Sequence, residues 1–245
     1  MPYKIQWISL VLFVISLQAQ AFAPVGLRCE NGFPKKLQVD ALTSCNQETI
    51  STKLQPGMPS FDATLTDLIL RHNNIGGSVV NFPNQSKVVY RSANLGGSPL
   101  CLQELHQIRK VDTIFNLSNS PIGHQSQQTM LEENLFESLG GDAYVKIFNI
   151  ALQPQSKITK EYYLNVAKVI HYINDAQGNV LIHCLAGEHV TGVIFGVMQK
   201  CYNQIPIEFV KKNTRCHFGQ AQTQYMHDMA NLAIKIIEDY PCAIL

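Results

Sequence analysis

Residues 183–192 carry the clearest chemical pattern of the chain, reading His-Cys-Leu-Ala-Gly-Glu-His-Val-Thr-Gly. A thiol follows an apolar strand-like run, and two glycines and a threonine lead into an apolar helix-like run. Backbone N–H groups at such a junction can surround an anion, and the helix N-terminus adds about half a positive charge. The same field favours the thiolate of Cys184, which could attack phosphorus and form a covalent thiophosphate. The spacing therefore predicts a phosphate-binding loop with Cys184 as nucleophile.

This segment resembles the signature of the protein-tyrosine and dual-specificity phosphatase superfamily, His-Cys-x-x-Gly-x-x-Arg-Ser/Thr-Gly, at every fixed position except the arginine. An upstream Val89-Tyr90-Arg91-Ser92 is similar to a segment common in its compact bacterial and dual-specificity members. The resemblance covers about residues 85–240. It implies Cys184 as nucleophile, Thr191 as partner of the thiolate and His183 as a supporting residue. The phosphate-binding backbone that it implies comprises Leu185, Ala186, Gly187, Glu188, His189, Val190 and Thr191.

Two departures from the signature concern catalysis. Val190 replaces the arginine that in the superfamily contacts two phosphate oxygens, and each charge-assisted contact is worth about 1.5–3 kcal/mol. Loss of a transition-state donor typically costs about 10²–10³ in rate. The superfamily also places a general acid before the long helix that precedes the cysteine, but residues 149–160 contain no Asp or Glu. We expect an exported phosphate or phospho-ligand binder with weak or lost phosphomonoester hydrolysis.

Two other interpretations stay open. The chain could be an active cysteine-dependent phosphatase whose phosphate-binding charge comes from another arginine, such as Arg91 or Arg215. Alternatively, Cys184 could serve redox or structural ends in an exported domain. A metal held by Cys184 and its histidine neighbours, His183 and His189, would disrupt an anion-binding loop, so no metal and no other cofactor is expected.

Composition points to a folded globular protein. Of the 245 residues 46% are hydrophobic and 15% charged, which is unlike a disordered chain. The net charge of +1 gives no reason to expect nucleic acid or an anionic membrane as partner. The partner expected from the loop is a phosphorylated protein or a small phosphoester.

Residues 1–23 are typical of a secretory signal peptide. Lys4 precedes an apolar run at 7–17, and small residues at 19–23 offer cleavage sites. The run is shorter than the about 20 residues that a membrane span requires. We therefore expect a periplasmic or secreted protein with no stable membrane insertion after cleavage, an uncleaved N-terminal anchor being the alternative.

Export also bears on the seven cysteines. If Cys184 is the functional thiol, six remain, an even number that suits disulfides in an oxidising compartment. Sequence alone does not choose among the pairings, although Cys29 with Cys45 and Cys201 with Cys216 are the sequence-local possibilities. Buried free thiols are the alternative.

The expected organisation is a signal peptide at 1–23, an N-terminal extension at 24–84 and a phosphatase-like domain at 85–245. Prolines at 24, 34, 56 and 59 punctuate the extension. Its one convincing helix covers residues 61–71, and Asn-Asn-Ile-Gly-Gly-Ser at 73–78 is a cluster of structure breakers.

Strand-like and helix-like segments alternate in the domain, which predicts an α/β fold with a mostly parallel central sheet flanked by helices. This is also the cysteine-phosphatase, dual-specificity phosphatase-like fold that the resemblance implies. Expected strands cover 88–90, 111–117, 144–150 and 180–182, the last of them buried on both faces. The first expected helix begins at Pro99, with Leu102, Leu105 and Ile108 on one face. A second passes through Leu131, Leu135 and Leu139, and a third, long helix follows a Thr159 cap. Three more are expected at 193–201, 207–212 and 221–237.

Overall fold

A computed structural model describes residues 29–47, 73–118, 124–147, 150, 152, 157–218 and 224–245. The predicted signal peptide and the helix predicted at 61–71 lie outside these residues. So does most of the segment between 148 and 156.

The described residues form one five-stranded sheet of order β1-β2-β5-β3-β4. β1 pairs with β2 in antiparallel fashion, and the three other pairings are parallel. The predicted mostly parallel α/β sheet is thereby confirmed. β1 falls inside the predicted N-terminal extension, and the boundary at 84/85 stays a prediction. The strands are β1 (Gly76–Asn81), β2 (Ser86–Ser92), β3 (Val111–Asn116), β4 (Ala143–Lys146) and β5 (Asn179–His183).

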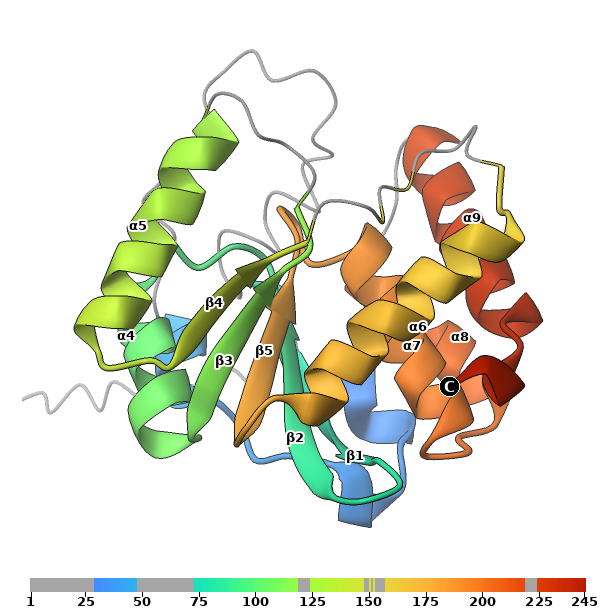
Figure 1. The fold of residues 1–245 in the computed structure, drawn as a ribbon, viewed down its shortest axis with the longest axis horizontal. Helices are drawn as coiled ribbons and strands as arrows, with labels where there is room; N and C mark the ends of the chain where they lie inside the picture. The colour runs from blue at the N-terminus through green and yellow to red at the C-terminus, as the bar shows by residue number, and fades with distance from the viewer. Residues whose placement is uncertain are drawn as a thin grey trace, which may run out of the picture.

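Helices cover both faces of the sheet (Figure 1), with α4 and α5 on one side and α6 to α9 on the other. Thr159 caps α6 as predicted, because its Oγ1 accepts a bond from Tyr162 N at 3.2 Å. The α-helices are α2 (Thr43–Gln47), α4 (Pro99–Gln103), α5 (His124–Ser138), α6 (Lys160–Asp175), α7 (His189–Cys201), α8 (Ile207–His217) and α9 (Gln224–Asp239). Shorter turns of helix are η1 (Cys29–Gly32), η2 (Lys35–Leu37), the π-helix η3 (Glu104–Ile108) and η4 (Cys242–Ile244).

The sheet separates two apolar cores, and β5 contributes to both. Val180 and Ile182 belong to the larger core, which the sheet shares with α6 to α9, whereas Leu181 belongs to the core under α4 and α5. Successive side chains of a strand point to opposite faces, so a run of three apolar residues fills both cores. The predicted central strand, buried on both faces, is confirmed, and it gives the loop that follows a rigid base.

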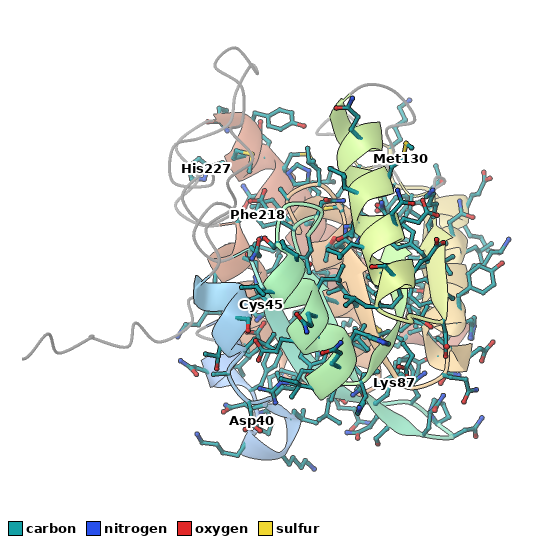
Figure 2. All side chains as sticks on the ribbon, turned by 90° about the vertical axis from the view of Figure 1, so that its left-hand side faces the viewer. Asp40, Cys45, Lys87, Met130, Phe218 and His227 are labelled. Carbon is teal, nitrogen blue, oxygen red and sulfur yellow. A yellow bond between two sulfur atoms is a disulfide. The ribbon has the colours of Figure 1, made fainter. Side chains whose placement is uncertain are left out.

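One helix expectation was wrong in detail. Leu102 and Leu105 are buried, but Ile108 is 67% exposed because the chain changes from α4 to the π-helix η3, which rotates later residues away from the α-helical register. The helix predicted through Leu131, Leu135 and Leu139 is α5, and Leu135 and Leu139 pack against the core under α4 and α5. Glu132 and Phe136 are buried, whereas Leu131 is 55% exposed and Met130, labelled in Figure 2, is 57% exposed.

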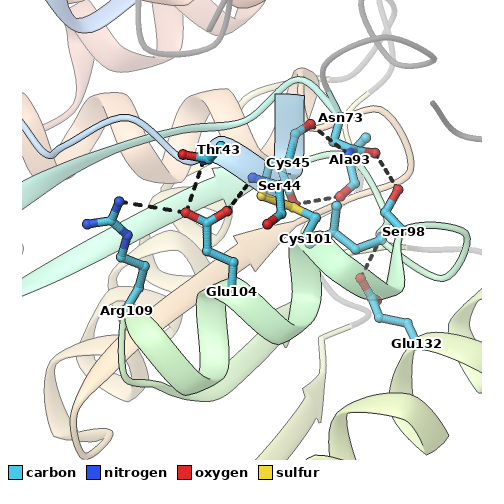
Figure 3. Close-up of a disulfide and its surroundings, with 12 residues drawn as sticks. Thr43, Ser44, Cys45, Asn73, Ala93, Ser98, Cys101, Glu104, Arg109 and Glu132 are labelled. Carbon is cyan, nitrogen blue, oxygen red and sulfur yellow. Dashed lines mark hydrogen bonds and ion pairs between the residues drawn. A yellow bond between two sulfur atoms is a disulfide. The ribbon is translucent and has the colours of Figure 1, made fainter. Parts of the chain in front are cut away.

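Three disulfides join distant segments, and all seven cysteines are described. The bonds are Cys29–Cys216, Cys45–Cys101 and Cys201–Cys242, and Cys184 is free. The prediction of six paired cysteines is confirmed, but both sequence-local pairings were wrong, because the fold places η1 against α8 and α2 against α4. Figure 3 shows the bond between α2 and α4.

Within the described ranges, no helix combines the length and apolar character that crossing a bilayer requires.

Candidate functional site

Cys184 lies where β5 ends, and four loop residues separate it from α7. Its side chain is partly buried and packs against the larger core. Glu188 occupies the N-cap position of α7 without a side-chain capping bond to the first turn. The thiol therefore lies beside a helix N-terminus whose backbone donors are not satisfied by the cap.

The loop is attached to the rest of the protein through three successive carbonyl groups. A peptide unit is planar and trans, so its N–H points opposite to its C=O. The N–H groups of Ala186, Gly187 and Glu188 therefore point away from the groups that hold the preceding carbonyls. Those bonds are Asn94 N to Leu185 O at 3.0 Å, Asn74 Nδ2 to Ala186 O at 2.9 Å and Arg91 Nη2 to Gly187 O at 2.6 Å.

The loop N–H groups have few partners of their own. Within the described ranges, those of residues 185–187 meet no hydrogen-bond acceptor. The first three of α7, at 189–191, are also unpaired there, since the helix begins its bonding with Gly192 N to Glu188 O at 2.7 Å. A row of unpaired donors at a helix N-terminus can bind an oxyanion.

Gly187 is required by the backbone of the loop. Its φ of +72° lies in the left-handed region. A Cβ at this position would lie 2.3 Å from Ser92 O and 2.7 Å from Ala93 N, both backbone atoms at the end of β2. Glycine thus allows the loop to rest directly on the neighbouring strand.

Val190 and Thr191 are both buried in the first turn of α7. Val190 is 5% exposed and belongs to the larger apolar core, so its side chain offers a ligand neither charge nor donor. The Thr191 hydroxyl has no hydrogen-bond partner among the residues described. This hydroxyl is therefore available to a ligand or to the thiolate.

His183 is held by a buried polar network that the sequence did not predict. Its Nε2 lies 2.9 Å from Glu132 Oε2, and its Nδ1 lies 3.2 Å from the carbonyl oxygen of Cys184. Tyr144 donates to Glu132 and accepts from Asn116 Nδ2 at 3.0 Å. Burial, followed by the Glu132 charge, raises the pKa of Tyr144, so this hydroxyl stays a donor. Nothing in the sequence distinguishes Glu132 from an exposed glutamate of a helix.

Arg91 lies beneath the loop, with no exposed surface. Its guanidinium is 5.3 Å from the centre of the Phe195 ring. Burial lowers the pKa of Arg91 to about 10, against the opposing effects of Glu30, Cys184 and Glu188, so the group is charged at neutral pH. Its Nη2 donates to the carbonyl oxygen of Gly187, so Arg91 supports the loop.

His189 does not supply the missing positive charge. Burial lowers its pKa to about 4, so the ring is neutral at physiological pH. The ring packs beside Phe218 and Tyr225, with centroid distances of 5.5 and 6.4 Å, and its Nε2 is 3.7 Å from Glu188 Oε2.

The segment at 149–160, predicted to lack a general acid, is described only at 150, 152 and 157–160. Among the described residues, no group of three or more His, Cys, Asp or Glu side chains is arranged to hold a metal ion.

No protein-family model matches the chain, and no curated protein matches it. Three solved structures illustrate what it is similar to. The core catalytic domain of the PP-IP phosphatase SIW14 from S. cerevisiae is 19% identical over 62% of this chain and 80% of that chain, with a TM-score of 0.45. TpbA of P. aeruginosa is 17% identical over 64% and 85%, with a TM-score of 0.42. The Trypanosoma brucei protein tyrosine phosphatase TbPTP1 is 11% identical over 71% and 78%, with a TM-score of 0.39. Similarities this distant assign no activity.

Proposed function

We propose that the chain binds phosphate or a phosphorylated ligand at residues 184–191 and hydrolyses phosphomonoesters weakly or not at all. The observation that carries this proposal is the row of N–H groups at residues 185–187 and 189–191, near Cys184, that meet no acceptor in the part of the chain that the structure describes. Three carbonyls are tied to the scaffold, so the donors are already oriented before a ligand arrives. A tetrahedral oxyanion supplies the acceptors that such donors require.

Weak catalysis follows from the charges around the loop. Val190 packs in the apolar core, and Arg91 is buried against a loop carbonyl. Arg215 is exposed on α8, and His189 is neutral at physiological pH. Phosphoryl transfer is stabilised by positively charged groups that donate hydrogen bonds to the negatively charged equatorial oxygens, and loss of one such donor costs about 10²–10³ in rate. These observations support binding without efficient turnover.

The alternative of an active enzyme would depend on the buried guanidinium of Arg91. Its Nη2 donates to Gly187 O at 2.6 Å, and its Nε and Nη1 have no hydrogen-bond partner among the described residues. A redox role would be favoured by a disulfide at Cys184, which has none.

We further propose that the protein is exported, with residues 1–23 as its signal peptide. The three disulfides support this proposal, because such bonds persist in oxidising compartments.

The decisive experiment titrates the purified wild-type protein with tungstate and inorganic phosphate, with chloride at equal ionic strength as the control. Binding is measured by calorimetry and by the rise in melting temperature. We expect saturable binding of both oxyanions and background hydrolysis of para-nitrophenyl phosphate. No binding of either oxyanion would refute the function. Hydrolysis above background that Cys184→Ser abolishes would refute the impaired activity.

Val190→Arg tests the reason for the impairment. Because the position is buried, the melting temperature of this variant must first be compared with that of Val190→Leu, an apolar control. Hydrolysis that appears only in Val190→Arg would identify an active site that lacks one charge. A folded Val190→Arg with no gain would contradict this explanation.

A further inference from the structure

Four buried polar side chains form a second network, separate from that of His183. They come from η1, from the turn before β1 and from α8, and none is more than 2% exposed. The bonds are Asn213 Nδ2 to Glu30 Oε1 at 3.0 Å, His217 Nε2 with Glu30 Oε1 at 2.8 Å, His217 Nδ1 with Asn74 Oδ1 at 2.9 Å, and Asn74 Nδ2 to His217 O at 3.1 Å and Ala186 O at 2.9 Å.

The bonds of Asn74 fix the direction of this network. Its amide nitrogen donates to two carbonyl oxygens, so its own oxygen must face His217. Nδ1 of His217 therefore carries a hydrogen and donates to it. Nε2 of His217 lies 2.8 Å from Oε1 of Glu30. One continuous chain of hydrogen bonds thus leads from Glu30 to the carbonyl of Ala186.

A disulfide brings Glu30 and His217 together. Cys29 immediately precedes Glu30, and its partner Cys216 immediately precedes His217, although 187 positions separate the two cysteines. Space around the pair is also limited, since a Cβ on Gly76 would lie 2.7 Å from Glu30 Oε1. The bond therefore maintains a contact that neither segment could form from its local sequence.

We propose that Glu30 and His217, held together by Cys29–Cys216, are positioning residues of the loop, acting through Asn74 on the peptide between Ala186 and Gly187. This proposal rests on the anion binding proposed above. Because the carbonyl of Ala186 is drawn toward Asn74, the N–H of Gly187 points to the opposite side, where it can meet the anion. The segment at 29–32 then supports the binding site, although it does not contact the ligand.

Two neighbouring asparagines provide a matched test. Asn73 and Asn74 are both buried, and both have positive φ angles of 52° and 46°. Glycine accepts this conformation, so Asn74→Gly and Asn73→Gly each remove an amide side chain without straining the backbone. Asn73 bonds instead to Cys45 O and Ser98 Oγ, so only Asn74→Gly releases the loop.

The readouts are tungstate affinity by calorimetry and the amide NMR signal of Gly187, which reports the loop even if no anion binds. We expect Asn74→Gly to weaken tungstate binding about tenfold, equivalent to about 1.4 kcal/mol, and to displace the Gly187 signal. Asn73→Gly should change affinity less than about twofold and leave the signal in place, even if both variants lower the melting temperature.

The disulfide is tested by Cys29→Ser/Cys216→Ser, with Cys201→Ser/Cys242→Ser as the control. Cys201 ends α7, about 20 Å along the helix from the loop, so its bond should not affect the loop. We expect about tenfold weaker tungstate binding in the first double variant only. If that variant does not fold, the asparagine pair decides.

The outcomes separate the two proposals. No tungstate binding by the wild type refutes the function, and the Gly187 signal still tests the positioning. Normal binding by the wild type, with equal affinities and unmoved Gly187 signals in Asn74→Gly and Asn73→Gly, overturns the positioning role and leaves the function standing.

Discussion

Gly187→Ala is the most direct perturbation of the loop. The added Cβ would lie 2.3 Å from Ser92 O, 2.4 Å from Ser92 C and 2.7 Å from Ala93 N. All three are backbone atoms at the end of β2, a strand paired on both sides, so no side-chain rotation relieves the overlap. The substitution must therefore move the loop.

Two effects set the magnitude. An alanine held at a φ of +72° costs about 1–2 kcal/mol. The overlap with β2 adds about 1–3 kcal/mol, as is usual for forced shifts in packed regions. We expect a loss of about 2–5 kcal/mol in the free energy of unfolding, a large share of the 5–15 kcal/mol typical of a domain. Displacement of Gly187 O from Arg91 should also weaken tungstate binding in any folded fraction.

Gly192→Ala is the matched control. Its Cβ would meet Arg91 Nη2 at 3.7 Å and Thr214 Cγ2 at 3.8 Å, which are ordinary contacts. Because Gly192 lies within α7, alanine should leave stability unchanged or raise it by about 0.5–1 kcal/mol. Urea denaturation measures both variants. The reasoning is refuted if Gly187→Ala unfolds within about 1 kcal/mol of the wild type, or if Gly192→Ala is equally damaging.

Three further predictions concern other parts of the fold. Burial lowers the pKa of His189 from 6.5 to about 4, so the melting temperature of the wild type should decline as the pH falls from 6.5 to about 4. His189→Phe should remove the contribution of this histidine to the decline. Lys200 donates to three carbonyls at the end of α9, at 2.7–3.0 Å. Lys200→Met should therefore lower the free energy of unfolding, measured by urea denaturation, by about 1–3 kcal/mol. Lys235→Met, which removes an exposed ion pair, should lower it by under about 0.5 kcal/mol. Glu104 accepts hydrogen bonds from two N–H groups at the start of α2 (Figure 3). Glu104→Gln, which retains a single acceptor oxygen, should lower the free energy of unfolding by about 1–2 kcal/mol in the same assay. An unchanged free energy of unfolding would show that this contact contributes nothing.

Local patterns in the sequence determined the order of the elements. The run Val180-Leu181-Ile182 specified a strand buried on both faces. Thr159 marked the start of α6. Such signals act over a few residues, through backbone preference, capping and the period of apolar positions, so they are readable without the fold. The loop at 183–192 was recognisable for the same reason, because its spacing is itself local.

Only the tertiary structure decided which groups hold that loop. Asn74 and Arg91 lie about a hundred positions before the carbonyls that they bind, and Glu132 reaches His183 from another helix. The disulfide between Cys29 and Cys216 likewise joins two positions that are 187 residues apart in the sequence. A polar residue looks the same in sequence whether it is solvated or buried, and burial is set by contacts between distant segments. The chemistry of the loop was therefore legible in the sequence, whereas its mechanical support required the fold.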